Sequence, residues 1–282
     1  MIHDFLLEVF DITNPEFSAY GYHNENEIYF CLEKMRVRLL QILMMFNLGD
    51  VSAASSTTYS NYQKNVAHYE KIADKFFREF EEILDLLDKD AEAILNGDPA
   101  ANTIQEVVTT YPGFFAIAIH RVAHFFYKQE LRTLARIMSE YAHQLTGIDI
   151  HPGAKIGESF CIDHGTGVVV GETTIVGKNV KIFQGVTFGA LSVKKHLQNL
   201  KRHPTIEDNC VIYSSATILG GETVIGANTI VGGNVWLTHS VPANSIVTNK
   251  SEIKMVSHQE KKLEELAESH EQYGIQKRKK RR

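Results

Sequence analysis

The sequence predicts an α+β protein, in which a helical N-terminal part is followed by a solenoid of short strands. Two observations support this fold class. Apolar residues recur at helical spacing from Tyr62 onward, and between Ile148 and Trp236 an aliphatic residue returns every six positions. The six-residue series consists of Ile150, Ile156, Ile162 and Val168, then, after a slip of two residues, Val176, Ile182 and Phe188, and finally Ile206, Ile212, Ile218, Val224, Ile230 and Trp236.

A lasting period of six belongs neither to an α-helix nor to a single strand, and it indicates a repeat architecture. Each six-residue unit is expected to form one short strand, and three strands to close one triangular coil. The apolar residue points into the shaft, while Gly, Asn and Asp between the strands permit the tight bends. Stacked coils then share one continuous core.

The N-terminal part is expected to contain several helices. Their expected positions are residues 1 to about 62 with a polar break at 52–60, a long amphipathic helix in the stretch from Tyr62 onward with its stop at Gly97, and two further helices at 114–128 and 131–145. Asp98-Pro99 follows the long helix at once and offers an N-cap and a first-turn proline for a short helix. The sequence thus predicts a helical domain over 1–145, a solenoid domain over 146–242 and a charged tail over 243–282.

The composition limits the class of protein. A net charge of −5 over 282 residues gives no reason to expect nucleic acid or an anionic membrane as a partner, and the basic residues 277–282 are interpreted as a solvated tail. Cys31, Cys161 and Cys210 are too few and too scattered for a disulfide framework or a thiolate zinc site. The first residues lack a basic leader, and no stretch approaches about eighteen apolar residues. We therefore expect a soluble, cytoplasmic protein.

Three short phrases place ionisable residues in an otherwise structural repeat. They are Asp149-Ile150-His151-Pro152, Asp163-His164-Gly165 and Arg202-His203-Pro204. A solenoid needs small polar residues at its corners, but it does not need His, Asp and Arg there. Asp149 precedes His164 by a little less than one coil, so a carboxylate could lie within reach of the imidazole, and such a pair is a suitable general base. The simpler interpretation of a lone histidine in a repeat is a surface residue.

Two further features are weighed against simpler explanations. Residues 190–201 abandon the period and carry lysines and a histidine, which indicates a loop extruded from one coil, a common place for binding. His120 and His124 stand four apart on an expected helix, the spacing of a two-histidine metal pair. No acidic third ligand is near them in the sequence, so we expect no metal site.

Several phrases of the sequence together resemble serine O-acetyltransferases, members of the hexapeptide-repeat acyltransferase superfamily. These phrases are Asp98-Pro99-Ala100, Tyr111-Pro112-Gly113-Phe114, the runs 148–157 and 162–173, Val186-Thr187-Phe188-Gly189 and Arg202-His203-Pro204. They appear in this order between about residues 90 and 240. The resemblance implies a left-handed parallel β-helix behind a helical domain, trimeric through the β-helix and often a dimer of trimers through the helices.

The resemblance also implies a reaction and a set of site residues. The acetyl group of acetyl-CoA would pass to the hydroxyl of L-serine, giving O-acetylserine for cysteine biosynthesis. By family position, His164 removes the hydroxyl proton and Asp149 orients the imidazole. The remaining implied roles are binding of the substrate ammonium by Asp98 and Asp163, binding of its carboxylate by Arg202 and His203, and contact with CoA near Gly189, Ala190, Ser214 and Gly232.

The resemblance implies partners, and the sequence departs from the family at two places that matter. L-cysteine is expected as a feedback inhibitor, because it differs from serine by one atom and can use the same pocket. Many relatives bind O-acetylserine sulfhydrylase through a terminal isoleucine, whereas Ile275 is followed here by seven residues and cannot supply a terminal carboxylate, so the sequence gives this complex only weak support. Trp236 stands where a small aliphatic residue is usual, and we expect it to cap the shaft.

Other interpretations of the same repeat differ in their chemistry. One is an acetyltransferase of the same superfamily that acts on another hydroxyl or amine, such as that of a sugar. A second is a β-helix carbonic anhydrase with histidines bridging subunits around zinc. A third is a trimeric scaffold without enzymatic activity, which periodicity alone does not distinguish from an enzyme.

Overall fold

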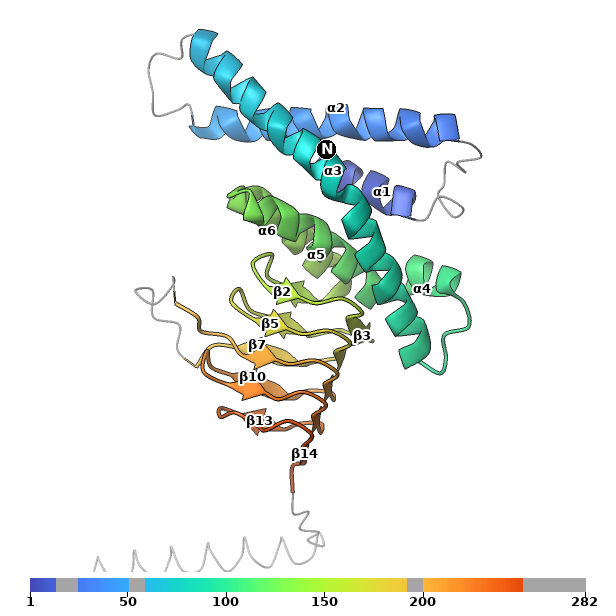
Figure 1. The fold of residues 1–282 in the computed structure, drawn as a ribbon, viewed down its shortest axis with the longest axis vertical. Helices are drawn as coiled ribbons and strands as arrows, with labels where there is room; N and C mark the ends of the chain where they lie inside the picture. Colours follow the sequence, from blue (N-terminus) through green and yellow to red (C-terminus); the bar gives the residue numbers. More distant parts are fainter. Residues whose placement is uncertain (14–24, 51–58, 192–199, 251–282) are drawn as a thin grey trace, which may run out of the picture. The chain divides into compact units, whose positions relative to one another are not determined.

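The computed structural model describes residues 1–13, 25–50, 59–191 and 200–250 (Figure 1). Its helices are α1 (Ile2–Thr13), α2 (Glu25–Asp50), α3 (Tyr59–Gly97), α4 (Ile104–Thr110), α5 (Pro112–Lys128) and α6 (Arg132–Thr146). Most of the predicted polar break, most of the extruded loop and the C-terminal tail from residue 251 onward lie outside the described residues. None of the described helices combines the length and the apolar character that crossing a membrane requires.

The helices differ from the expectation at α3 and α4. α3 has 39 residues, nearly eleven turns at about 3.6 residues each, which is longer than predicted. It ends at Gly97 as expected. The prediction of Asp98 as the N-cap of the next helix is wrong, because α4 begins only at Ile104 and its N-cap is Thr103, whose side chain accepts a hydrogen bond from the Glu106 amide. The Asp98 side chain is engaged elsewhere.

The described residues between Asp149 and Val247 form a left-handed parallel β-helix. Its strands are β1 (Asp149–Ile150), β2 (Lys155–Ile156), β3 (Cys161–Asp163), β4 (Val169–Val170), β5 (Ile175–Val176), β6 (Lys181–Phe183), β7 (Thr187–Gly189), β8 (Thr205–Ile206), β9 (Val211–Ile212), β10 (Thr217–Leu219), β11 (Val224–Ile225), β12 (Ile230–Val231), β13 (Trp236–Leu237) and β14 (Ile246–Val247). They form three flat sheets in the orders β1-β4-β7-β10-β13, β2-β5-β8-β11 and β3-β6-β9-β12-β14.

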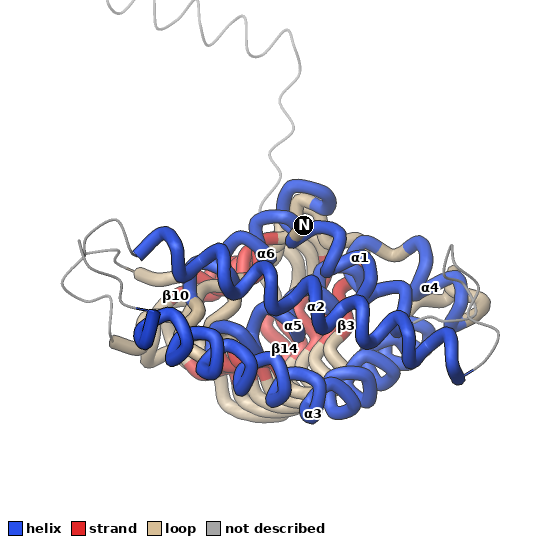
Figure 2. The backbone as a smooth tube through the Cα atoms, turned by 90° about the horizontal axis from the view of Figure 1, so that it is seen from above, coloured by secondary structure: helices blue, strands red, loops and turns tan. Residues whose placement is uncertain are grey.

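The helices lie across the N-terminal end of the β-helix, as Figures 1 and 2 show from two directions. α3 and α5 pack against β3, and α6 packs against β1. Residues Met1–Thr248 form one compact unit, and one continuous core runs from the helices into the shaft. The end of α3 is thereby held beside the first coil, where the sequence predicts the reactive residues.

The six-residue series predicts the inward residues of the first coils, but it loses the register in the last ones. Ile206, Ile212 and Ile218 are fully buried in the shaft, as predicted. The next inward residues are Ile225, Val231 and Leu237, and not Val224, Ile230 and Trp236. The cause is one extra residue in the corner between Ile218 and Ile225, where Gly220 adopts φ of +105°. Trp236 therefore points outward and is 69% exposed, so the prediction that it caps the shaft is wrong.

The slip of two residues in the series has a structural meaning. Ile162 and Val170 are successive inward residues although they are eight positions apart, because the corner from His164 to Gly167 contains two additional residues. His164 and Gly165 in this corner both have positive φ, +58° and +97°. The insertion therefore lifts the His164 side chain out of the regular prism at the edge of the sheet.

A buried histidine makes the helical layer sensitive to acid. His120 on α5 is 2% exposed, and within the described part of the chain its Nδ1 has no hydrogen-bond partner. Burial, followed by repulsion from His124 and Arg121, lowers the pKa of His120 well below its usual value. The folded protein therefore binds fewer protons than the unfolded chain once the pH falls below about 6.5, the usual pKa of histidine.

We expect the free energy of unfolding to have its full value above about pH 6.5 and to decrease as the pH drops below that value. The decrease due to His120 is up to about 1.4 kcal/mol per pH unit. Urea unfolding at about pH 7.5 and about pH 5.5 measures this slope. The variant His120→Gln should flatten it, whereas His143→Gln, on an exposed side chain, should not. An unchanged slope in His120→Gln would contradict the assignment.

Candidate active site

Three segments meet at the corner that follows β3. The end of α3 reaches it at Gly97, and the start of α5 reaches it at Gly113, with Pro112 as the first helical residue. A Cβ atom on Gly113 would lie 2.3 Å from the carbonyl oxygen of Ile162, so only glycine lets α5 begin directly against β3. This close approach brings Asp98, Tyr111 and the last residue of β3, Asp163, together.

Asp98, Asp163 and His164 form one cluster in the structure. His164 Nε2 lies 3.8 Å from Asp163 Oδ1, and the His164 side chain is 75% exposed whereas that of Asp163 is 11% exposed. The Asp98 carboxylate accepts hydrogen bonds from the Ala100 amide at 2.9 Å and from the Tyr111 hydroxyl at 2.8 Å. These two hydrogen bonds lower the pKa of Asp98. The corner therefore presents two carboxylates beside an accessible imidazole.

Two members of this cluster were not identified from the sequence. Tyr111 donates to Asp98, and this hydrogen bond raises the pKa of the Tyr111 hydroxyl to about 12, so it remains a donor. Lys181 on β6 forms an ion pair with Asp163 at 2.9 Å. Tyr111 belongs to a phrase that carried the family resemblance, whereas Lys181 occupies an ordinary outward position of a repeat and gives no signal in the sequence.

Asp149 heads the outward row of the sheet that begins at the same corner. It pairs in register with Val169, the first strand residue after the His164 corner. Within the described residues, no hydrogen bond or ion pair joins its carboxylate to His164. Its negative charge acts on His151, where it opposes the lowering of the histidine pKa that burial causes. The role of Asp149 in orienting His164 stays a prediction.

Arg202 and His203 lie in a second cluster with Glu172 and Thr173. Arg202 is ion-paired with Glu172, whose other oxygen accepts from the Tyr127 hydroxyl at 2.6 Å. His203 Nδ1 accepts a hydrogen bond from the Thr173 amide at 3.0 Å, and burial lowers the pKa of His203 to about 4. The imidazole is thus neutral at physiological pH, with Nε2 as its hydrogen-bond donor.

The position of the His203 ring depends on a glycine. A Cβ atom on Gly171 would lie 2.0 Å from His203 Cδ2, so any other residue at 171 would displace the imidazole. Gly171 and Thr173 belong to the run 162–173 that carried the resemblance, but their contact with His203 was not foreseen. The sequence separates them from His203 by about thirty positions, and only the stacking of one coil on the next brings them together.

The two clusters lie at opposite edges of one sheet. The edge where the sheet β3-β6-β9-β12-β14 turns into the sheet β1-β4-β7-β10-β13 holds His164, and we call it the His164 edge. The edge where the latter sheet turns toward β2-β5-β8-β11 holds Arg202 and His203, and we call it the Arg202 edge. Within one chain, no described hydrogen bond or ion pair connects Asp98, Asp163 or His164 with Arg202 or His203. A single chain therefore holds the predicted site residues in two separate clusters.

The residues predicted to contact CoA divide in the same way. Ser214 follows β9 and Gly232 follows β12, so both lie on the His164 edge, below His164 along the axis. Backbone hydrogen bonds link these stacked corners, from the Gly185 amide to Thr166 and from the Asn234 amide to Ser214. Gly189 ends β7 and Ala190 follows it, which places both on the Arg202 edge.

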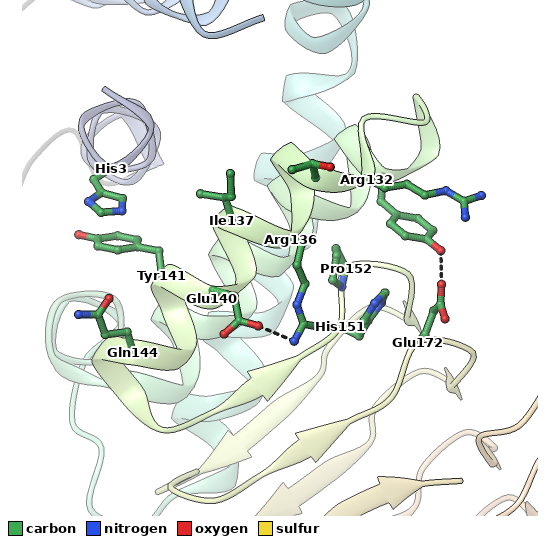
Figure 3. A pocket seen from close by; sticks show the side chains of 12 residues that line it. His3, Arg132, Arg136, Ile137, Glu140, Tyr141, Gln144, His151, Pro152 and Glu172 are labelled. Atoms are coloured by element: carbon green, nitrogen blue, oxygen red, sulfur yellow. Dashed lines mark hydrogen bonds and ion pairs between the residues drawn. The ribbon is translucent and has the colours of Figure 1, made fainter. Parts of the chain in front are cut away.

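A cavity of about 560 Å³ opens beside the Arg202 edge (Figure 3). Its lining includes Arg132 and Arg136 from α6 together with Tyr127, His151 and Glu172. The Tyr127 hydroxyl donates to Glu172, the residue that also pairs with Arg202, and Figure 3 labels Glu172 among the side chains that line the cavity. The cavity thus adjoins the second cluster, and His164 is not among its lining residues.

The described residues contain no group of three or more His, Cys, Asp or Glu side chains arranged to hold a metal ion. The His120 and His124 rings are 5.7 Å apart between centroids and tilted by 32°. His124 Nδ1 is hydrogen-bonded to the Pro152 carbonyl oxygen at 2.8 Å. One of the two ring nitrogens of His124 is therefore already hydrogen-bonded to the backbone.

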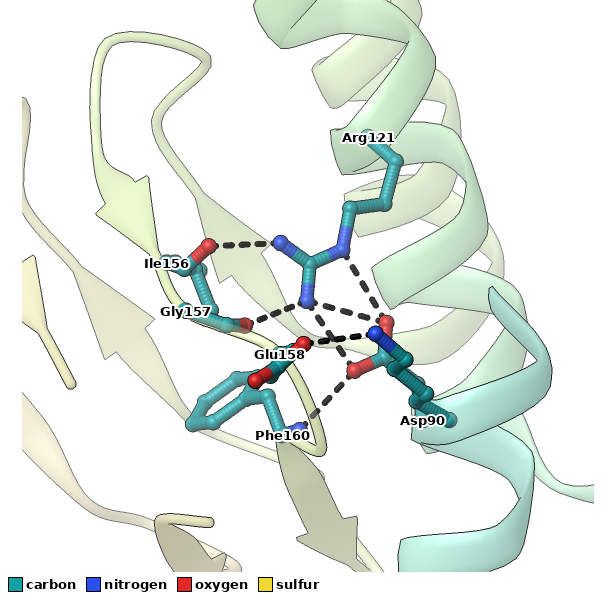
Figure 4. Close-up of polar contacts among 7 residues, drawn as sticks. Asp90, Arg121, Ile156, Gly157, Glu158 and Phe160 are labelled. Atoms are coloured by element: carbon teal, nitrogen blue, oxygen red, sulfur yellow. Dashed lines mark hydrogen bonds and ion pairs between the residues drawn. The ribbon is translucent and has the colours of Figure 1, made fainter. Parts of the chain in front are cut away.

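A buried ion pair fixes the helices on the first coil (Figure 4). The Arg121 guanidinium donates to both oxygens of Asp90 at 3.0 Å and to the carbonyl oxygens of Ile156 and Gly157 at 2.6 Å. Asp90 also accepts from the Phe160 amide at 2.8 Å. Burial raises the pKa of Asp90 to about 6, against the opposing effect of Arg121. Asp90 lies on α3 two turns before Asp98, so this contact determines where Asp98 stands.

Comparison with known proteins gives relatives of one kind. No family model matches the chain. It is 50% identical over 186 residues to a plasmid-encoded serine acetyltransferase of Synechococcus elongatus, covering 64% of this chain and 58% of that protein. It is 49% identical over 134 residues to the serine acetyltransferase of Bacillus licheniformis, covering 48% of this chain and 60% of that protein. The chain thus spans 58% to 60% of the length of these two curated relatives.

Solved structures agree over a longer part of the chain. Serine acetyltransferase isoform 3 of Entamoeba histolytica, in complex with cysteine, superimposes with a TM-score of 0.77 at 31% identity, covering 90% of this chain and 83% of that one. The serine acetyltransferase of Neisseria gonorrhoeae in complex with serine gives a TM-score of 0.58 at 30% identity, covering 68% and 76%.

Proposed function

Because this chain belongs to the serine acetyltransferase family, we propose that it transfers the acetyl group of acetyl-CoA to the hydroxyl of L-serine. The products are O-acetylserine and CoA, in the pathway to cysteine. The observation that carries the proposal is the cluster of Asp98, Asp163 and His164. Two carboxylates suit the ammonium group of an amino acid, and the exposed imidazole beside them suits its hydroxyl.

In the proposed mechanism, His164 acts as the general base. Its neutral imidazole removes the hydroxyl proton of serine while the serine oxygen attacks the thioester carbonyl of acetyl-CoA. The carbon–sulfur bond then breaks, and the imidazolium returns the proton to the departing thiolate of CoA. Asp149 is proposed to orient the imidazole, and the backbone near Ser214, Gly232, Gly189 and Ala190 to contact CoA.

The carboxylate of serine is proposed to bind Arg202 and His203. A guanidinium fork beside a neutral imidazole that donates from Nε2 fits a carboxylate well. These residues lie on the Arg202 edge, so we propose that the site is completed between two protomers. In a cyclic trimer each subunit meets its neighbour through two different patches, and the His164 edge of one chain would face the Arg202 edge of the next.

Mixing two inactive variants tests this arrangement. His164→Ala and Arg202→Ala are each expected to lose most activity at low serine concentration, the second through a raised KM for serine. In randomly mixed trimers, about a quarter of the interfaces combine an intact His164 edge with an intact Arg202 edge, because each edge comes from a different chain. Co-expression of the two variants with different tags, followed by purification on both, removes the trimers of a single variant. Each remaining mixed trimer has one intact interface out of three, so about a third of the wild-type activity should be restored. A site confined to one chain would give none.

L-cysteine is proposed to bind the same site and to compete with serine. Its thiol replaces the hydroxyl of serine, whereas its ammonium and carboxylate groups can make the same contacts. The cysteine complex of the Entamoeba relative supports this proposal. Inhibition by cysteine should be relieved by serine. A noncompetitive pattern would contradict a shared pocket.

The overall proposal is tested by release of free thiol from acetyl-CoA in the presence of L-serine, compared with homoserine and with hexose acceptors. Serine should be preferred by a wide margin, because its ammonium and carboxylate are both recognised. Preference for a sugar would instead support the alternative that the protein is an acetyltransferase acting on another hydroxyl or amine. The mass of the protein in solution, measured in parallel, tests the trimer or dimer of trimers.

A further inference from the structure

We propose that Lys181 is a positioning residue of the serine site, which holds the Asp163 carboxylate and the end of α3 in the arrangement that receives the substrate ammonium. The inference rests on the proposed function and deepens it. It concerns a residue that no pattern in the sequence singles out, and it makes Lys181 an internal cation on which the geometry of the site depends.

The contacts of Lys181 join three elements. Its Nζ lies 2.9 Å from Asp163 Oδ2, at the end of β3, and donates to the carbonyl oxygen of Gly97 at 2.6 Å, at the end of α3. The same nitrogen lies 4.5 Å from the centroid of the Phe183 ring, on its own strand. An ammonium has three N–H donors and no acceptor. The Asp163 carboxylate, the Gly97 carbonyl and the face of the Phe183 ring therefore provide one partner for each of the three N–H groups.

These contacts fix both carboxylates of the cluster. Gly97 immediately precedes Asp98, so the hydrogen bond to its carbonyl anchors the backbone from which Asp98 projects. Asp163 is directed by its ion pair: Oδ2 is held by Lys181, and Oδ1 is the oxygen that faces His164 at 3.8 Å. The oxygen beside the imidazole is thus the one left for the substrate ammonium.

The charges of the cluster lead to the same conclusion. Asp98 and Asp163 carry two negative charges, and Lys181 supplies one positive charge, so one further ammonium would balance the site. The Asp163 side chain is only 11% exposed, and a carboxylate that is this buried is costly without a cation. Without Lys181, Asp163 would be expected to turn toward water or to take up a proton, and either change removes a substrate contact.

A competing effect predicts the opposite sign. If Lys181 acted only through its charge, it would repel the substrate ammonium, and its removal would tighten serine binding. Because Lys181 bridges two carboxylate-bearing segments and is only 19% exposed, we expect the loss of positioning to exceed the relief of repulsion. The sign of the change in KM for serine therefore decides between the two effects.

The experiment compares Lys181→Met, Lys181→Arg and Lys178→Met with the wild type. Methionine keeps the unbranched apolar part of the side chain and removes the charged nitrogen. Lys178 lies one corner away, where its 61% exposed side chain pairs with Glu158, and exposed pairs of this kind contribute little. Lys181→Met is expected to raise the KM for serine by about tenfold or more, as the loss of a charged hydrogen bond does, with the KM for acetyl-CoA nearly unchanged. Lys181→Arg should recover part of the loss, and Lys178→Met should match the wild type.

Serine-induced stabilisation gives a second measurement that does not depend on turnover. Melting of each protein without serine first shows that the fold is kept, and the rise in Tm with serine then reports binding. A smaller rise in Lys181→Met than in the wild type supports the inference. An equal or larger rise, or an unchanged or lowered KM for serine, overturns it. A wild type that binds serine but does not acetylate it would refute the proposed function and leave the binding test of Lys181 valid.

Discussion

Replacing His164 is expected to lower kcat for serine acetylation by about 10²- to 10⁴-fold, the usual contribution of a general base. The fold should be kept, because the side chain is 75% exposed and its ion pair with Asp163 is 3.8 Å long. The backbone needs more care than the side chain. His164 has φ of +58°, a conformation in which Asn is tolerated better than Ala. His164→Asn is therefore the sharper variant, and His164→Ala serves beside it.

The measurement is steady-state kinetics together with thermal melting and mass in solution. His164→Asn should melt close to the wild type and assemble in the same way, with its loss confined to kcat. His239→Asn, which alters an exposed histidine farther along the β-helix, should keep full activity. Full activity in His164→Asn is incompatible with the proposed mechanism, whatever the result for His164→Ala.

Arg121→Met is expected to cost about 3–5 kcal/mol of unfolding free energy, the typical penalty for leaving one partner of a buried ion pair alone. The side chains of Arg121 and Asp90 are 6% and 0% exposed, so water cannot replace the guanidinium. Two carbonyl oxygens, of Ile156 and Gly157, lose their donor as well. This is the largest stability effect that we expect from a single substitution.

A double-mutant cycle separates the pair from its surroundings. Asp90→Leu combined with Arg121→Met should be more stable than Arg121→Met alone, since the buried charge is then absent. Arg36→Met is the matched control, because Arg36 pairs with Asp74 at 37% and 45% exposure and such a pair contributes at most about 1 kcal/mol. Urea unfolding of Asp90→Leu, Arg121→Met, the double variant and Arg36→Met, each compared with the wild type, tests the assignment. A loss within about 1 kcal/mol in Arg121→Met would show that the ion pair does not stabilise the contact between helices and β-helix.

The shaft of the β-helix could be predicted from the sequence because its information is local. An inward residue such as Ile206 or Ile212 recurs at a fixed step along the chain, and that step is imposed by the length of one strand and one corner. The prediction failed at Trp236 because one additional residue near Gly220 changes the phase of every strand after it. A period can reveal a repeat, but it does not show which corner absorbs an insertion.

The two clusters could be predicted only in part. The phrases around His164 and Arg202 pointed to residues that the structure gathers into two clusters, one of which holds Asp98, Asp163 and His164, and their roles stay predictions. The residues that contact the predicted site residues were missed. Tyr111, Glu172 and Lys181 contact Asp98, Arg202 and Asp163, and such contacts cannot be inferred from the residue type. Lys181 and Gly97 are 84 positions apart, and no pattern in the chain links them.

By itself, the sequence determined the repeat, the length of the long helix to within a few turns, and the identity of the ionisable residues at the corners, since each of these depends on neighbours along the chain. The tertiary structure decided which corners lie on the same edge, that Lys181 holds Asp163 and the end of α3, and that His164 and Arg202 stand at opposite edges of one sheet. The physical reason is that the stacking of coils and the docking of helices bring together residues that are many positions apart in the sequence. Such contacts form, and stabilise the protein, only when the chain is folded.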